Sequence, residues 1–293
     1  MDDTIANLLD RFEALLARAE QLLPEPASAP DWERSTAFRW HRRGDSGWLE
    51  SLQSTDPITL NHLVGIDRQK HTVTRNIEQF LAGLPANNML LWGARGTGKS
   101  SLLKALLNQY ARQGLRVIEV DRVDLLQLPQ ITQIIAGRSE RFLLYCDDLS
   151  FEAGDPGYKA LKVVLDGSLT TGGDNLLVCA TSNRRHLMPE PASDNLATTH
   201  DDGEIHFGEG VEERISLSDR FGLWLAFHPF DQQQYLQVVD HWLGQFGHGD
   251  QFDAAREEAL RWALTRGSRS GRTAWQFCRD WVGRSGLQQG GRL

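Results

Sequence analysis

The sequence has few cysteines and no long apolar segment. Its three cysteines, Cys146, Cys179 and Cys278, are odd in number and show no paired spacing, so we expect neither disulfides nor a thiolate metal site. No apolar run approaches the roughly 18 residues that a membrane helix needs. The acidic start MDDTIANLLD lacks the basic region of a signal peptide. We therefore expect a cytoplasmic protein without a membrane partner.

An excess of positive charge is also missing. The formal net charge is −8, which argues against a nucleic-acid footprint over the whole surface. Residues 186–219 hold nine acidic residues and one arginine, whereas residues 261–293 hold seven arginines and one acidic residue. Solvated faces explain both runs. The basic run also allows a nucleic-acid partner, and the acidic run allows a basic protein.

Two elements are expected before residue 61. Apolar residues recur at helical spacing over residues 4–23, which predicts an amphipathic helix that ends before the segment PEPASAP. Residues 36–52 alternate apolar and polar side chains on both sides of a Gly-Asp-Ser-Gly turn, which predicts a β-hairpin. Its basic side chains suit either phosphate contacts or a charged outer face: Arg39, His41, Arg42 and Arg43.

From residue 61 onward, short apolar strands alternate with helical segments. We predict strands over 89–93, 116–121, 142–147, 176–181 and 223–230, and helices over 67–82, 99–112, 123–135 and 156–169. This alternation is typical of an α/β fold with a parallel sheet, here of five strands, that is covered on both faces. Three further helical stretches follow without a strand, over 231–246, 253–266 and 271–283. The expected domains are an N-terminal helix and hairpin (1–60), an α/β domain (61–230) and a C-terminal helical domain (231–293).

The segment LLWGARGTGKSSLL, residues 90–103, lies between a predicted strand and a predicted helix. A glycine-rich turn brings backbone N–H groups around an anion, and the helix behind it adds unpaired N–H donors and a positive dipole end. Gly93, Gly98, Lys99 and Ser100 fit the pattern G-x-x-x-x-G-K-[ST] without gaps. In this pattern the lysine reaches the β- and γ-phosphates and the hydroxyl binds Mg²⁺. The sequence therefore predicts a phosphate-binding loop for a nucleoside triphosphate.

Polar side chains end two of the predicted strands. Asp147 and Asp148 follow the apolar run FLLYC, where Asp147 would hold Mg²⁺ through water and Asp148 would polarise the attacking water. Asn183 ends LLVCATSN and could hydrogen-bond that water or the γ-phosphate, while Thr181 is expected only to cap the strand. No strand ends in N-K-x-D, the guanine-selecting pattern, so we expect adenine as the base.

The order VGID, GARGTGKS, YCDD, ATSN, SDRFG and GSRSGR resembles that of an AAA+ P-loop ATPase, and more closely that of an uncharacterised bacterial AAA+ family labelled as a domain of unknown function. The resemblance covers residues 36–283. It implies a helical lid, a site for ATP and Mg²⁺, and a homo-oligomer that is a ring or an open assembly. It implies these nucleotide-binding residues: Val64, Gly65, Gly93, Ala94, Arg95, Gly96, Thr97, Gly98, Lys99, Ser100, Ser101 and, as sensor 2, Arg272. It implies Ser100 and Asp147 as metal ligands, and as catalytic residues Lys99, Asp148, Asn183 (sensor 1) and Arg220 (arginine finger).

One position departs from the AAA+ pattern. Most members carry glutamate after the first acidic residue of this strand, whereas this chain has Asp148. The side chain is one methylene shorter, and a misplacement on the order of 1 Å can cost about 100-fold in rate. We therefore expect slow hydrolysis. If hydrolysis does not depend on Asp148, nearby Glu152 is the first alternative base.

The leading functional hypothesis is an ATPase that couples ATP binding and hydrolysis to remodelling or loading of an unknown protein or nucleic-acid partner. The alternative is a nucleotide-dependent switch or scaffold with little turnover, which the shorter Asp148 and the lack of a partner-binding motif both allow. A P-loop kinase for a small molecule is a third reading, but the chain shows no lid with paired arginines between the second and third predicted strands.

Overall fold

The computed structural model describes residues 11–12, 29–44, 46–52, 56–152, 155–166, 174–185, 187, 199–201, 204–206 and 219–290. Apart from positions 11 and 12, the helix predicted over residues 4–23 lies outside the described residues. Most of the acidic segment 184–219 lies outside them as well.

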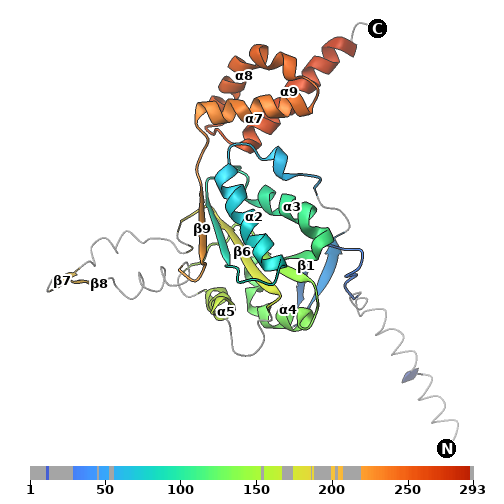
Figure 1. Ribbon diagram of the computed structural model, residues 1–293, viewed down its shortest axis with the longest axis vertical. Helices are drawn as coiled ribbons and strands as arrows, with labels where there is room; N and C mark the ends of the chain where they lie inside the picture. The colour runs from blue at the N-terminus through green and yellow to red at the C-terminus, as the bar shows by residue number, and fades with distance from the viewer. Residues whose placement is uncertain are drawn as a thin grey trace, which may run out of the picture.

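The main sheet has seven strands in the order β2-β1-β4-β5-β6-β3-β9 (Figure 1). The strands are β1 (Ala37–Arg43), β2 (Ser46–Leu52), β3 (Met89–Gly93), β4 (Leu115–Glu119), β5 (Arg141–Cys146), β6 (Leu176–Ser182) and β9 (Leu223–Phe227). Two short strands, β7 (Thr199–Asp201) and β8 (Glu204–His206), form a separate antiparallel pair.

The structure corrects the predicted number of strands. The predicted parallel core of five strands is present as β4-β5-β6-β3-β9, but the predicted hairpin, β1 and β2, belongs to the same sheet. Ala37, Phe38 and Arg39 of β1 pair in parallel with β4, and β2 pairs antiparallel with β1. Ala37, Phe38, Trp40 and Leu49 of the hairpin are buried. The pairing of β1 also covers an edge of β4 that would otherwise leave backbone groups unpaired.

Seven α-helices accompany the strands within the described residues. They are α2 (Asp67–Leu81), α3 (Lys99–Tyr110), α4 (Leu128–Ile135), α5 (Pro156–Leu165), α7 (Gln232–Gln245), α8 (Phe252–Thr265) and α9 (Gly271–Gly290). The helix predicted over 123–135 is divided into two elements. Its first part is the 3-10 helix Arg122–Gln127, and α4 follows with a proline in its first turn.

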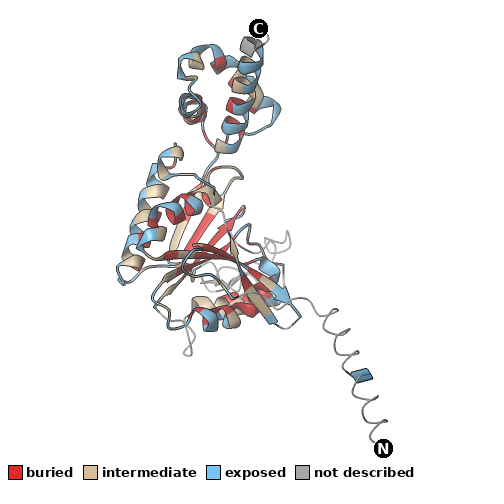
Figure 2. Ribbon diagram, turned by 90° about the vertical axis from the view of Figure 1, so that its right-hand side faces the viewer, coloured by how far each residue is buried: buried red, intermediate tan, exposed pale blue. Residues whose placement is uncertain are grey.

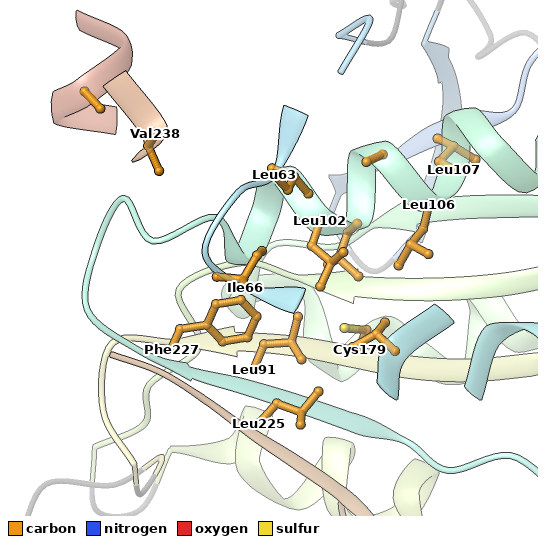
Figure 3. Packing of buried hydrophobic residues seen from close by; sticks show 14 of the residues in the cluster. Leu63, Ile66, Leu91, Leu102, Leu106, Leu107, Cys179, Leu225, Phe227 and Val238 are labelled. Atoms are coloured by element: carbon orange, nitrogen blue, oxygen red, sulfur yellow. The ribbon is translucent and has the colours of Figure 1, made fainter. Parts of the chain in front are cut away.

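Two apolar layers enclose the sheet (Figure 2). Helices α2 and α3 pack on one face, where Leu91, Cys179 and Leu225 of neighbouring strands meet Leu102 and Leu106 of α3 (Figure 3). Helices α4 and α5 pack on the other face, over the alternate residues of the same strands. Strands buried on both faces read as continuous apolar runs, which is why the sequence predicted them well.

Helices α7, α8 and α9 pack together at one end of the molecule (Figure 1). A capping box between Asp231 and Gln234 starts α7, and the buried Tyr235 hydroxyl donates a hydrogen bond to the Ala259 carbonyl at 3.1 Å. The apolar core of these helices continues into the layer over α2 and α3. Within the described residues, no helix is long and apolar enough to cross a membrane.

Candidate nucleotide-binding site

The predicted site residues gather at one edge of the sheet. Strands β3, β5 and β6 run parallel, so the loop after Gly93, the acidic pair after Cys146 and Asn183 all follow carboxyl ends at the same edge. Ligands of open α/β sheets bind at this edge.

The glycines of the phosphate-binding loop are required by its backbone. Gly93 has φ 131°, and a Cβ there would lie 2.1 Å from the Phe227 carbonyl oxygen. Gly98 has φ 103° and leads directly into α3, so its left-handed conformation also favours glycine. The loop therefore approaches β9 closely and places a helix N-terminus, with its N–H donors, at the cavity.

Lys99 is buried at the start of α3. Its Nζ donates to the carbonyl oxygens of Gly93 and Ala94, both at 2.8 Å. Burial lowers the pKa of Lys99, and the carboxylates of Asp147 and Asp148 oppose that shift without cancelling it. The ammonium group is thus held against its own loop, where an anion would offer it a stronger partner than two neutral carbonyls.

The two predicted metal ligands are adjacent. Ser100 Oγ donates to Asp147 Oδ1 at 3.0 Å. Burial raises the pKa of Asp147, but hydrogen bonds from hydroxyl groups, that from Thr181 the largest, outweigh it and leave the pKa lowered. The described residues contain no cluster of three or more His, Cys, Asp or Glu side chains that could hold a metal. One carboxylate and one hydroxyl suit Mg²⁺, which keeps waters and takes its other ligands from substrate phosphates.

Asp148 lies in a strained and well-connected position. Its φ is 49°, in the left-handed region that non-glycine residues seldom occupy. Its N–H donates to Thr181 Oγ1 at 3.0 Å. Its carboxylate accepts hydrogen bonds from Asn183 Nδ2 and, at 3.3 Å, from Arg95 Nη2. The predicted base is thus held by the predicted sensor and by the phosphate-binding loop.

Thr181 has a larger role than the predicted strand cap. Its hydroxyl donates to Asp147 Oδ1 and accepts from the Asp148 N–H, so it connects both acidic residues. Side chains alternate between the two sides of a strand, so Thr181 lies on the same side of β6 as Asn183. This alternation is the sequence feature that could have assigned Thr181 to the site.

These side chains line a cavity of about 770 Å³. The predicted residues that line it are Val64, Arg95, Gly96, Thr97, Gly98, Lys99, Ser100, Ser101, Asp147, Asp148, Asn183 and Arg272. Gly65, Gly93, Ala94 and the alternative base Glu152 are not among its lining residues.

The sequence did not point to the aromatic part of the lining. His62, Phe230, Trp242 and Trp275 line the same cavity, together with apolar residues such as Ile66 and Val238. Helical spacing shows which face of a helix is apolar but not what that face meets. The lid residues could therefore not be assigned to the site before the packing of α7 and α9 was known.

Arg272 brings the lid to the phosphate-binding loop. Its backbone N–H donates to the Gly96 carbonyl oxygen at 3.2 Å, at the start of α9. Gly96 has φ 75°, and a Cβ there would lie 2.9 Å from Ser270 Oγ. The loop and the first turn of α9 are therefore in direct contact, with no room for a side chain between them.

Arg220 lies apart from this group. It precedes β9 at the amino end of the strand and forms an ion pair with Asp166, whereas the cavity is at the carboxyl end of the sheet. A strand of five residues spans about 16 Å, and Arg220 is not a lining residue of the cavity. Its predicted role as an arginine finger therefore stays a prediction that involves a neighbouring subunit.

The fold and the order of the motifs place the protein in the class of AAA+ P-loop ATPases. Among solved structures, a point mutant of RuvB from Thermotoga maritima is similar with a TM-score of 0.51 at 14% identity, covering 76% of this chain and 64% of that chain. Residues 33–285 match the family described as "Protein of unknown function (DUF815)", and the chain belongs to this family.

Curated relatives are similar over part of the chain. The chain is 23% identical over 183 residues to the replication factor C large subunit of Methanococcus vannielii and 25% identical over 183 residues to that of Methanococcus aeolicus. Each alignment covers 59% of this chain, and 35% and 37% of the respective relative. The chain thus spans about a third of the length of these relatives.

Proposed function

We propose that this protein binds ATP and Mg²⁺ in the cavity and hydrolyses ATP slowly, coupling both steps to remodelling or loading of a macromolecular partner. The observation that carries the proposal is the convergence of Lys99, Ser100, Asp147, Asp148 and Asn183 at one edge of the sheet. Each has the chemistry that phosphoryl transfer requires, and their types and order match the motifs that predicted them.

Binding follows from charges and donors that are already in place. The backbone N–H groups of residues 96–100 would hold the phosphates, and Lys99 would exchange its two carbonyl partners for phosphate oxygens. Ser100 and Asp147 would hold Mg²⁺, which supplies positive charge to the phosphate oxygens when bound.

Hydrolysis requires an oriented and polarised water. Asp148 is the candidate for polarising it and Asn183 for orienting it, since their side chains contact each other on the cavity wall. Arg95 must leave the Asp148 carboxylate, or share it, before a water can be polarised there. This requirement and the short aspartate side chain both favour a low rate.

The same observation supports a second candidate function. If Asp148 stays engaged by Arg95 and Asn183 with nucleotide bound, ATP fixes a conformation without being consumed, and the protein acts as a switch or scaffold.

We further propose that residues 61–230 form the nucleotide-binding domain with 231–293 as its lid, and that the protein forms homo-oligomers in the cytoplasm. The partner is a protein or a nucleic acid.

Steady-state ATP turnover, measured for wild type and Asp148→Asn with and without cell extract, tests this proposal. We expect slow wild-type turnover that extract stimulates, and ATP binding without turnover in the variant, because the amide keeps the size of the side chain but cannot polarise water in the same way. Binding without turnover in the wild type would favour the switch. Turnover that survives in Asp148→Asn would show that the base lies elsewhere.

A further inference from the structure

Besides the phosphate-binding loop, aromatic rings line the cavity. His62, Phe230, Trp242 and Trp275 contribute there. Aromatic side chains stack on nucleobases because every base has a π-face. A ring can stack on an incoming base only if one of its faces is not already covered by protein, and the four rings differ in this respect.

Three of the rings are already engaged. Phe230 is 6% exposed, and its ring lies 3.5 Å from where a Cβ of Gly65 would be and 3.8 Å from where a Cβ of Gly271 would be, so it is wedged between two backbone segments. The ring of Trp242 has three aromatic neighbours with centroids 5.4–6.1 Å away: His62, His241 and Phe246. His62 in turn contacts Trp242 and His241.

Trp275 is different. It lines the cavity and is 37% exposed, so part of its surface is not covered by protein. It lies three residues after Arg272, whose N–H contacts the phosphate-binding loop. Three residues advance a helix by about 4.5 Å and nearly complete a turn. Trp275 is therefore about one turn beyond the contact between Arg272 and the phosphate-binding loop, on nearly the same side of α9.

Arg279 covers one face of this indole. Its guanidinium carbon lies 4.7 Å from the ring centroid, one helical turn further along α9. The indole lines the cavity and Arg279 does not, which is consistent with a guanidinium on the face of the ring that is turned away from the cavity. A guanidinium over an indole is an attractive cation–π contact, and here it leaves the cavity-facing side of the ring available.

We propose that Trp275 stacks on the nucleobase of the nucleotide held at the phosphate-binding loop, with Arg279 fixing the indole ring from its other face. The proposal rests on the nucleotide site proposed above and adds a base-binding residue from the lid. Stacking does not read hydrogen bonds on the base edge, so Trp275 contributes affinity for nucleotides over bare triphosphate, and the choice between bases depends on other groups.

Calorimetric titration of the full chain with two ligands, ATP and inorganic tripolyphosphate, each with Mg²⁺, tests the proposal. We expect Trp275→Leu to weaken ATP binding by about 5- to 150-fold, the range of one base–aromatic stack. Trp275→Phe keeps a π-face and should retain most of the affinity. Neither variant should change the affinity for tripolyphosphate, which has no base.

Arg279→Ala should weaken ATP binding by a smaller factor, because the ring keeps its stacking surface but loses its brace. Arg266→Ala is the matched control: Arg266 covers Trp262 of the same lid at 3.6 Å, and neither residue lines the cavity. We expect this control to bind ATP like the wild type. Melting temperatures separate loss of stacking from general damage to the lid.

Three outcomes would overturn the proposal. Unchanged ATP affinity in Trp275→Leu would exclude stacking. In that case, weaker binding of both ATP and tripolyphosphate by Lys99→Ala would show that the nucleotide site itself is correctly assigned. If Trp275→Leu lost affinity for ATP and for tripolyphosphate equally, the effect would come from a change in the lid and not from a lost contact with the base. A wild type that binds neither ligand would overturn the proposed function together with this inference.

Discussion

At the scale of single residues, Thr181 connects the two acidic side chains of the site. One hydroxyl group donates to the Asp147 carboxylate and accepts from the Asp148 N–H, and it is 1% exposed. It therefore helps to keep Asp147 ionised and supports the left-handed backbone of Asp148. Because both partners of its hydroxyl belong to the acidic pair, we expect Thr181 to act as a positioning residue.

Replacing Thr181 by valine keeps the shape of the side chain and removes both hydrogen bonds. We expect a stability loss of about 1–3 kcal/mol from the unpaired buried groups, and turnover reduced by roughly 100-fold if Asp148 shifts by about 1 Å. ATP affinity should change much less, since Lys99 and the loop are untouched. Thermal melting and separate kcat and KM values measure these effects.

Thr181→Ser is the control, because serine keeps the hydroxyl and should preserve most of the turnover. Equal defects in the serine and valine variants would contradict this role, since they would trace the effect to the methyl group.

Single residues also show what the sequence can predict. It was predictable that Arg95 to Ser101 would line one cavity, because their spacing is set by one loop and one helix. Thr181 was recognised only as a strand cap, because both of its partners, Asp147 and Asp148, follow another strand. Trp275 gave no signal at all, since its neighbourhood depends on how the lid packs.

At the scale of elements, the first turn of α9 and the phosphate-binding loop form one junction. The Arg272 N–H binds the Gly96 carbonyl, and the Phe230 N–H binds the Arg269 carbonyl at 3.1 Å. The lid is thus attached to the loop and to the segment after β9 by backbone contacts. A change in the loop on nucleotide binding has a direct route to α9.

Gly96→Ala tests this junction. A Cβ at Gly96 would lie 2.9 Å from Ser270 Oγ and 3.0 Å from Arg272 Cβ, so the start of α9 must move. We expect ATP affinity to fall by roughly tenfold or more, which corresponds to about 1.4 kcal/mol of lost contacts. Calorimetry measures the affinity.

Gly114→Ala provides the matched control. Gly114 has φ 94°, similarly left-handed, but nothing lies within 4 Å of the added Cβ. It should lose stability, by about 1–2 kcal/mol, and keep ATP affinity. Equal affinity losses in both variants would mean that backbone strain, and not the lid contact, is responsible.

The elements themselves were mostly predictable. Strands β3, β5 and β6 are buried on both faces, so their apolar runs stand out in the sequence. The hairpin was also predicted, but its place in the sheet was not, because strand pairing between β1 and β4 joins residues 80 positions apart. Periodicity within a segment carries no information about such long-range partners.

At the scale of the whole molecule, the position of Arg220 bears on assembly. The residue lies at the amino end of β9 beside Asp166, away from the cavity of its own chain. If it acts on ATP, it acts on that of a neighbouring subunit. An arginine supplied in this way is worth about 10³- to 10⁵-fold in rate.

Mixing two variants tests assembly and Arg220 together. Arg220→Ala should bind ATP but hydrolyse it poorly, and Lys99→Ala should be inactive because it lacks bound nucleotide. In a mixture, an Arg220→Ala subunit can receive Arg220 from a Lys99→Ala neighbour, so part of the turnover should return. A mixture that co-assembles and stays inactive would show that Arg220 does not act on a neighbouring subunit and would favour a structural role, such as its ion pair with Asp166.

The central claim is that the cavity at the carboxyl edge of the sheet is an ATP site built around Lys99. Calorimetric titration with Mg²⁺ and ATP tests it most directly. We expect binding by the wild type, unchanged binding by Lys159→Ala, an exposed lysine of α5, and no tight binding by Lys99→Ala with its fold intact. ATP affinity in Lys99→Ala equal to that of the wild type would contradict the account.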